Sequence, residues 1–175
     1  MKIALLLFFV LSCAQASPKY NRKDWGYGRA DKKTCMNTRN KLLKERSLVD
    51  VVMNKSGCSV KSGKWDDYYY PEVHTLAVAV QMDHLIPLKH AHDVGGYNWS
   101  KKEKKTFAND PENLVITNAI YNQEKKDKLI SQWVPTNKSY ACKYWKDWMK
   151  LKNKYSLPIS EAEKNSVKNI QGCSI

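Results

Sequence analysis

An acidic residue and a histidine stand side by side at Asp83-His84, where an apolar run of the sequence ends. Hydrolysis of a phosphodiester needs a base that takes a proton from water and a cation that stabilises charge on the phosphate and the leaving oxygen. Histidine suits the base because its pKa lies near neutrality. A carboxylate and the amide oxygen of Asn122 are hard ligands of the kind that Mg²⁺ accepts. These residues could therefore form a one-metal phosphodiesterase site.

The end of a strand is where Asp83 and His84 can serve the same site. Neighbouring residues of a strand point to opposite faces, and Pro87, three residues later, indicates that the strand stops there. Asn113 precedes a second short apolar segment, and its side-chain amide could bond the backbone of the long loop around residues 90–96. That bond would hold the strand of His84 in place.

Two basic residues are candidates for binding the substrate. Lys125 follows Asn122 by three residues, so that both lie on one face of a helix, which could present a metal ligand and a phosphate-binding ammonium together. The alternative for Lys125 is a solvated surface lysine. Arg39 could reach the scissile phosphate, and its alternative is a simple pair with an acidic residue.

Helices and short strands are both predicted, and together they indicate an α+β domain. The run over residues 76–82 is short, apolar and partly β-branched, which favours a strand, as does the segment over 114–116. Residues 58–65 form a weaker strand candidate. Ser100 and Ser160 each precede a glutamate by three residues, a capping box that starts a helix. The spacing of apolar residues predicts helices over residues 32–53, 100–107, 117–130, 140–155 and 160–171, with Gly172 as the last stop.

The first sixteen residues resemble a secretory signal peptide. Lys2 is followed by an apolar stretch over residues 3–10 and by the small-x-small sequence Ala14-Gln15-Ala16. The apolar stretch is shorter than the roughly 20 residues that a bilayer requires, so an uncleaved anchor is the weaker interpretation. We expect residues 17–175 to form a single secreted domain, and a monomer.

Cysteine usage agrees with export. Cys13 lies in the signal region, which leaves four others in the remaining chain, and an even count in an oxidising compartment favours two disulfides. Three pairings are open, of which we favour the local one, and a zinc cluster is disfavoured because no two cysteines have Cys-x-x-Cys spacing. The favoured pairs are Cys35–Cys58 and Cys142–Cys173.

The chain carries a formal net charge of +13, with lysines spread along its length. Such an excess attracts polyanions through counterion release and conveys no sequence preference. A nucleic acid is therefore a candidate partner, although a solvated basic surface that only maintains solubility has the same composition. Charge by itself does not decide between these two interpretations.

The ordered motifs of the chain resemble those of the HNH, or ββα-metal, endonucleases, and in particular a small secreted branch of that family. The branch has DH-x-x-PL, a variable loop, NL, N-x-x-K and W-x-P, followed by a C-terminal helix rich in Tyr and Trp. This chain has the corresponding sequences at residues 83–88, 113–114, 122–125 and 133–135. The ordered combination is far more specific than any one of its parts.

The resemblance implies a β-hairpin and a helix that grip one divalent metal and cleave nucleic acid. By this analogy His84 is the general base, Asp83 and Asn122 are metal ligands, and Asn113 is the middle asparagine that holds the loop. The family's third position is most often histidine, and Asn122 occupies it here. An oxygen ligand favours Mg²⁺, with Mn²⁺ or Zn²⁺ as alternatives.

Other conspicuous residues have simpler explanations. His90 and His92 could form a second metal site with His84, but we expect them to be loop residues near the cleft. Trp145 and Trp148 are expected in the core, and Asp66-Asp67 in a turn.

The sequence thus predicts a secreted, metal-dependent endonuclease that acts on DNA, and alternatively on RNA, with little sequence preference. A basic, disulfide-linked protein that binds nucleic acid or an anionic surface without cutting it, such as a toxin, is the main alternative. A metal hydrolase acting on other substrates is the third.

Overall fold

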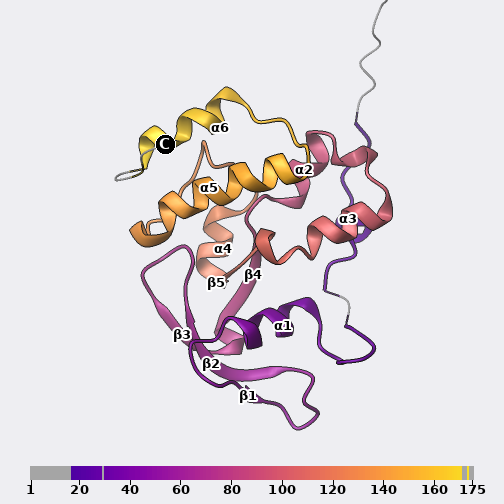
Figure 1. Cartoon of the computed structure of the whole chain (residues 1–175), viewed down its shortest axis with the longest axis vertical. Coiled ribbons are helices and arrows are strands. Elements are labelled where there is room, and N and C mark those ends of the chain that lie inside the picture. The colour runs from indigo at the N-terminus through magenta and orange to yellow at the C-terminus, as the bar shows by residue number, and fades with distance from the viewer. Residues whose placement is uncertain (1–16, 29, 171–172, 174–175) are drawn as a thin grey trace, which may run out of the picture.

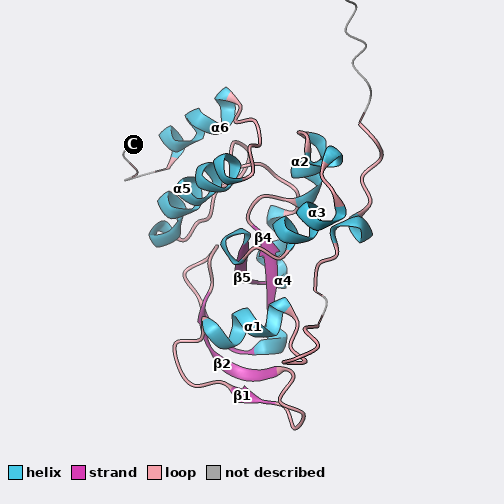
Figure 2. Ribbon diagram, turned by 45° about the vertical axis from the view of Figure 1, so that its right-hand side comes forward, coloured by secondary structure: helices cyan, strands magenta, loops and turns pink. Residues whose placement is uncertain are grey.

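The computed structural model describes residues 17–28, 30–170 and 173, and it has an α+β architecture (Figure 1). A small sheet with α1 lies at one end of the molecule, most of the helices lie at the other, and a two-stranded hairpin connects them (Figures 1 and 2). The helices of the described part are α1 (Thr38–Glu45), α2 (Leu88–Asp93), α3 (Lys101–Ala108), α4 (Ala119–Lys125), α5 (Lys138–Lys154) and α6 (Glu161–Asn165), with five short 3₁₀ turns η1 (Arg22–Trp25), η2 (Ala77–Ala79), η3 (Gly96–Asn98), η4 (Pro111–Asn113) and η5 (Ser166–Asn169).

A hairpin and the helix after it form the centre of the fold. Strand β4 (Val80–His84) pairs antiparallel with β5 (Leu114–Asn118) in a regular register that ends with His84 opposite Leu114. Helix α4 starts directly after β5, capped by the side chain of Asn118, and packs against both strands. The predicted strand over 114–116 is thus present and two residues longer. Residues 85–113, which include α2 and α3, connect the two strands.

The second sheet has the strand order β1 (Val52–Met53), β2 (Val60–Asp66) and β3 (Val73–Leu76), all antiparallel. It confirms the weaker strand predicted over 58–65. Gly63 is required in β2 because an added Cβ would lie 2.6 Å from the hydroxyl of Ser47 and 2.7 Å from the ring of Trp65. Trp65 itself is buried against α1 and donates its indole N–H to the carbonyl of Leu43 at 2.8 Å.

The predicted helix over residues 32–53 was too long at both ends. Asn37 accepts a hydrogen bond from the backbone N–H of Asn40, and this cap starts α1 only at Thr38. Val52 and Met53 pair with β2 instead of continuing the helix. Apolar residues in a short segment suit either structure, and here pairing within a sheet prevails.

Other predicted boundaries also moved. The apolar run over 76–82 is divided by η2, so that its two ends belong to β3 and β4 in different sheets. The predicted helix over 117–130 ends at Lys125, because Lys126 has a φ of 52°. The predicted helix over 160–171 gives way to η5 after Asn165, while Gln171 and Gly172 lie outside the described residues. The capping boxes at Ser100 and Ser160 are present as predicted.

Two disulfides close the two ends of the chain. Cys35 pairs with Cys58, and Cys142 pairs with Cys173, which is the local pairing that the sequence favoured. The first joins the segment before α1 to the start of β2, and the second joins α5 to the C-terminal segment. None of the helices in the described residues could cross a membrane. The predicted signal peptide, residues 1–16, lies outside the described part.

A buried charge cluster fastens α6 to α5 and α2. The carboxylate of Glu163 is almost completely buried, and it accepts hydrogen bonds from the indole of Trp148 at 2.8 Å and from Lys152 at 2.9 Å. His90 of α2 lies 2.7 Å from Nζ of Lys152. Burial would raise the pKa of Glu163, but hydrogen bonds from His90, the Ser160 backbone and Lys152 outweigh it and hold the pKa well below 4.5.

Replacement of Glu163 by glutamine should lower the free energy of unfolding by about 3–5 kcal/mol at neutral pH, because Lys152 would keep a buried charge without a partner. Because the folded protein lowers the pKa of Glu163, the wild type has the full stabilisation at pH values above 4.5, the ordinary pKa of a glutamate. That stabilisation is lost as the pH falls toward the folded-state pKa. Denaturant unfolding at neutral and acidic pH measures both effects. Glu161→Gln is the matched control, since Glu161 is exposed and pairs only with Lys164. Equal stability of the two variants would contradict this account.

Candidate functional site

Asp83 and His84 lie at the end of β4, on opposite faces of the strand. Asp83 faces α4, where its carboxylate meets Lys125. His84 lies on the other face, against Tyr27 and the C-terminal end of α3. β4 ends at His84, as Pro87 predicted, and one further backbone bond runs from the N–H of Leu85 to the carbonyl of Asn113, the residue before β5. The two side chains therefore leave the end of β4 in different directions, Asp83 toward α4 and His84 toward the end of α3.

The imidazole of His84 is held in one orientation and in one tautomer. Nε2 donates a hydrogen bond to the carbonyl of Ala108 at 2.8 Å, and the ring of Tyr27 packs edge-on at 5.0 Å between centroids. Because a carbonyl can only accept, the proton lies on Nε2 and the lone pair on Nδ1. Burial lowers the pKa of His84 to about 4, despite the opposing effects of the Ala108 carbonyl and Asp83. The ring is thus neutral near pH 7, as a proton acceptor must be.

The carboxylate of Asp83 uses only one of its oxygens for contacts within the protein. Oδ2 accepts hydrogen bonds from the hydroxyl of Tyr69 at 2.6 Å and from Nζ of Lys125 at 2.8 Å. Oδ1 accepts none from the described residues. The side chain is 13% exposed, so that this oxygen has limited access to solvent.

Asn122 lies on α4, on the side that faces β4. Its Nδ2 donates to Oε1 of Gln81 at 2.7 Å, and Gln81 lies on the same face of β4 as Asp83. The amide is thus oriented by Gln81, while its oxygen accepts no hydrogen bond from any described residue. Asp83 and Asn122 consequently offer two hard oxygen donors on neighbouring elements.

This donor set fits a Mg²⁺-type cation, which accepts one or two protein oxygens and retains water for its other positions. A site rich in histidine and cysteine would suit Zn²⁺ better. Among the described residues, however, no group of three or more His, Cys, Asp or Glu side chains could hold a metal.

Lys125 does not lie where a phosphate contact was expected. Its side chain is fully buried, and Nζ donates to the carbonyl of His84 at 2.9 Å as well as to Asp83. The alternative of a solvated helix lysine is wrong for the same reason. The face of α4 that carries Asn122 and Lys125 packs onto the hairpin, so the long lysine side chain crosses the interface to the end of β4 and is covered on the way.

Arg39 is also engaged within the protein. It projects from α1, and Nη2 donates to the carbonyls of Ala77 at 2.5 Å and Val80 at 2.9 Å, at the start of β4. Nη1 is buried without a hydrogen-bond partner in the described part of the chain. The guanidinium therefore ties α1 to the hairpin, and no acidic residue among those described pairs with it. A direct contact with the scissile phosphate stays a prediction.

Asn113 holds the chain immediately after His84. It is fully buried, its Oδ1 accepts from the backbone N–H of Ile86 at 2.8 Å, and Nδ2 donates to the Ile86 carbonyl at 3.4 Å. The sequence predicted such a bond, although to residues further along the loop. Among the described residues, the side chain of Asn113 hydrogen-bonds backbone alone, so it fixes the chain just after His84.

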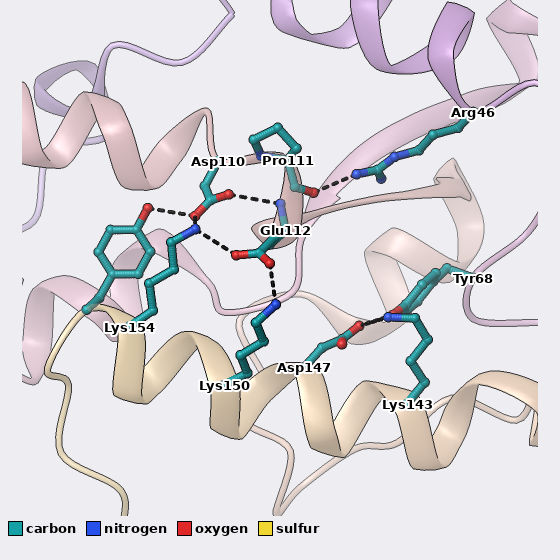
Figure 3. A network of polar contacts seen from close by, with 10 residues as sticks. Arg46, Tyr68, Asp110, Pro111, Glu112, Lys143, Asp147, Lys150 and Lys154 are labelled. Atoms are coloured by element: carbon teal, nitrogen blue, oxygen red, sulfur yellow. Dashed lines mark hydrogen bonds and ion pairs between the residues drawn. The ribbon is translucent and has the colours of Figure 1, made fainter.

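A network of polar contacts from α5 fixes the segment that begins at Ala108 and ends at Asn113 (Figure 3). Lys154 donates to Asp110 at 2.8 Å and to Glu112 at 2.6 Å, and Lys150 pairs with Glu112. Arg46, the residue directly after α1, donates to the Pro111 carbonyl at 2.6 Å. These contacts link the backbone that orients His84 to helices far from it in the sequence.

The two histidines that could have formed a second metal site with His84 lie apart from it. His90 and His92 belong to α2 instead of a loop, and Nε2 of His92 donates a hydrogen bond to the Pro18 carbonyl at 2.7 Å. His90 belongs to the Glu163 cluster. A joint metal site with His84 is therefore not formed. Trp148 is buried in the core, and Trp145 packs against it, as expected.

Sequence reasoning missed two residues near the site. Tyr69, which bonds Asp83, stood in a tyrosine run with no distinguishing signal. Asp67 was interpreted as a turn residue, and it is a fully buried acceptor for the loop that carries Tyr69. An aspartate two residues beyond a predicted strand and just before three tyrosines was the available signal.

The chain belongs to the HNH-type family described as GmrSD restriction endonucleases, C-terminal domain, which matches residues 30–168. The resemblance seen in the sequence is thereby confirmed. An uncharacterized secreted protein of Arthroderma benhamiae is 35% identical over 137 residues, which are 77% of this chain and 65% of that protein. The chain thus covers slightly less than two-thirds of this relative's length. No solved structure matches the chain.

Replacement of Asn113 by alanine should lower the free energy of unfolding by about 1–3 kcal/mol, because the buried N–H of Ile86 would lose its acceptor. Thermal or denaturant unfolding measures the loss. Asn153→Ala serves as the control, since Asn153 is exposed on α5 and should change stability little. A variant of Asn113 that is as stable as the control would show that the contact with Ile86 is not important for the fold.

Proposed function

We propose that this chain is a secreted, metal-dependent endonuclease that hydrolyses phosphodiester bonds of DNA, with RNA as a second candidate substrate. The observation that carries the proposal is the geometry of His84: its ring is fixed by a hydrogen bond from Nε2 to the carbonyl of Ala108, which leaves the lone pair on Nδ1 to take a proton. Membership in an endonuclease domain family supports it.

The hairpin β4–β5 and the helix α4 are proposed to be a ββα-metal core. The order of strand, connecting segment, strand and helix supports this assignment, as does the packing of α4 on both strands. Residues 17–175 would form one domain around this core. Export through cleavage after residue 16 is part of the same proposal, and the two disulfides support it.

In the proposed reaction, Nδ1 of His84 takes a proton from the attacking water. The hydrogen bond from Nε2 to Ala108 stabilises the imidazolium that forms, because a charged donor bonds a carbonyl more strongly than a neutral one. Asp83 and Asn122 would hold one divalent cation, Mg²⁺ by the chemistry of the donors, which supplies stabilisation of charge on the phosphate and the leaving oxygen. Asn113 keeps the end of β4 in place during the reaction.

The charge of the chain supports a substrate that is a polyanion. A net charge of +13 attracts the phosphate backbone and conveys no preference for sequence. Arg39, which has no acidic partner among the described residues, is the proposed source of positive charge close to the site. Base contacts carry sequence information, whereas contacts to phosphate do not, so we propose cleavage with little sequence preference.

Replacement of His84 by alanine should reduce the cleavage rate by about 100- to 10,000-fold, because a general base contributes factors of that size. Binding of DNA, measured at the same salt concentration, should be unchanged. His92→Ala is the matched control: it removes another buried histidine that bonds a backbone carbonyl, but one outside the site. Plasmid digestion by the His84 variant at the wild-type rate would exclude this residue as the base.

Cleavage should require a divalent metal and should stop when EDTA is added. Asn122→Ala should raise the Mg²⁺ concentration needed for half-maximal cleavage, because one of the two protein oxygens is lost. Gln123→Ala, a change at the exposed neighbour on α4, should not. The measurement is the conversion of supercoiled plasmid over a series of Mg²⁺ concentrations. Salt-sensitive binding without cleavage at any of them would favour the non-catalytic, toxin-like alternative.

A further inference from the structure

Tyr69 is completely buried, and its hydroxyl is directed at the candidate metal ligand Asp83. The oxygen lies 2.6 Å from Oδ2 of Asp83. The rings of Trp133 and Tyr144 pack edge-on against the ring of Tyr69, with distances between ring centroids of 4.8 and 6.1 Å. The hydroxyl is the donor of the hydrogen bond to Asp83, because a carboxylate oxygen accepts.

The loop that carries Tyr69 is fixed by the buried carboxylate of Asp67. Oδ1 of Asp67 accepts from the backbone N–H groups of Tyr69 at 2.8 Å and Tyr70 at 3.2 Å, and from the hydroxyl of Thr117 at 2.9 Å. Oδ2 accepts from the backbone N–H of Asn118 at 2.9 Å. Thr117 and Asn118 end β5, so these hydrogen bonds fix the loop around Tyr69 to the same hairpin that carries Asp83.

The two donors to Asp83 come from different elements and meet at one oxygen. Tyr69 reaches Oδ2 from the loop after β2, and Lys125 reaches it from α4. A carboxylate held in this way cannot rotate without losing both hydrogen bonds. Its other oxygen, Oδ1, is the one with no hydrogen bond from the described residues.

We propose that Tyr69 is a positioning residue for metal binding: its hydroxyl holds Oδ2 of Asp83, so that Oδ1 is presented to the cation as a single ligand. This inference rests on the proposed function of Asp83. Partners that orient a metal ligand commonly govern the affinity of the site without touching the metal. Tyr69 would therefore act on the affinity for the metal, and not on the step in which His84 takes the proton.

Tyr69→Phe tests the inference because it removes one oxygen and retains the buried ring. The variant should bind Mn²⁺, titrated calorimetrically without nucleic acid, about 10- to 100-fold more weakly. The Mg²⁺ concentration for half-maximal plasmid cleavage should rise by the same factor, while the rate at saturating Mg²⁺ stays near that of the wild type. A general disturbance of the fold would lower that rate instead.

Tyr68→Phe is the matched control. It deletes a hydrogen bond of the same length, 2.6 Å, from the neighbouring residue to Asp147, a carboxylate outside the site. Its affinity for Mn²⁺ and its Mg²⁺ dependence should equal those of the wild type. Equal Mn²⁺ affinity in the Tyr69 variant and this control would overturn the inference.

A measurement on the wild type decides the matter if Tyr69→Phe does not fold. In protein labelled with ¹³C at the tyrosine ζ position, Mg²⁺ should shift the Tyr69 signal with the midpoint found for cleavage, and should leave the Tyr68 signal in place. If the Tyr69 signal does not shift with Mg²⁺ in an active enzyme, this inference is wrong and the proposed function still stands. A wild type that neither binds Mn²⁺ nor cleaves would reject the proposed function, and the inference with it.

Discussion

A buried ion pair between Asp83 and Lys125 governs the arrangement of the site. Charges are buried at a high cost in free energy unless each finds a partner and further hydrogen bonds. Here the ammonium also bonds the His84 carbonyl, and the carboxylate also bonds the hydroxyl of Tyr69. Three elements, namely β4, α4 and the loop after β2, must therefore dock together for either charge to be tolerated. The same requirement determines which carboxylate oxygen stays available.

The proposed base and the proposed metal ligand are held by different sets of contacts. Ala108 orients His84, and the turn after Ala108 is fastened to α5 through Asp110 and Glu112. The Asp83 side depends instead on Tyr69 and, through it, on Asp67 and the end of β5. Two elements belong to both sides, because Lys125 bonds Asp83 as well as the His84 carbonyl, and Tyr144 of α5 packs against Tyr69. A disturbance of Lys125 or of α5 would therefore reach both residues.

The sequence gives more information on the candidate site than on its surroundings. Asp83, His84, Asn113 and Asn122 could be proposed because their types and order suggest the chemistry, and α3 and α6 could be predicted because their capping boxes are local signals. The burial of Lys125 could not be predicted, since the spacing of Lys125 from Asn122 on a helix is the same for a buried lysine as for an exposed one. The roles of Arg39 and Tyr69 depend on contacts between residues far apart in the chain. Such contacts follow from tertiary packing, which local spacing does not encode.

The segment that joins the two strands of the hairpin has a consequence for how the protein folds. Residues 85–113 separate β4 from β5 and contain α2 and α3, so that pairing of His84 with Leu114 closes a long loop. The entropy of closing such a loop is spent before the pairing contributes any stability. Contacts of this kind slow folding relative to local ones. The helices of the insert can form early from local signals, whereas the alignment of His84 with Ala108 and Asn113 is expected to be among the last events. The chain would then be compact before the proposed active site has formed.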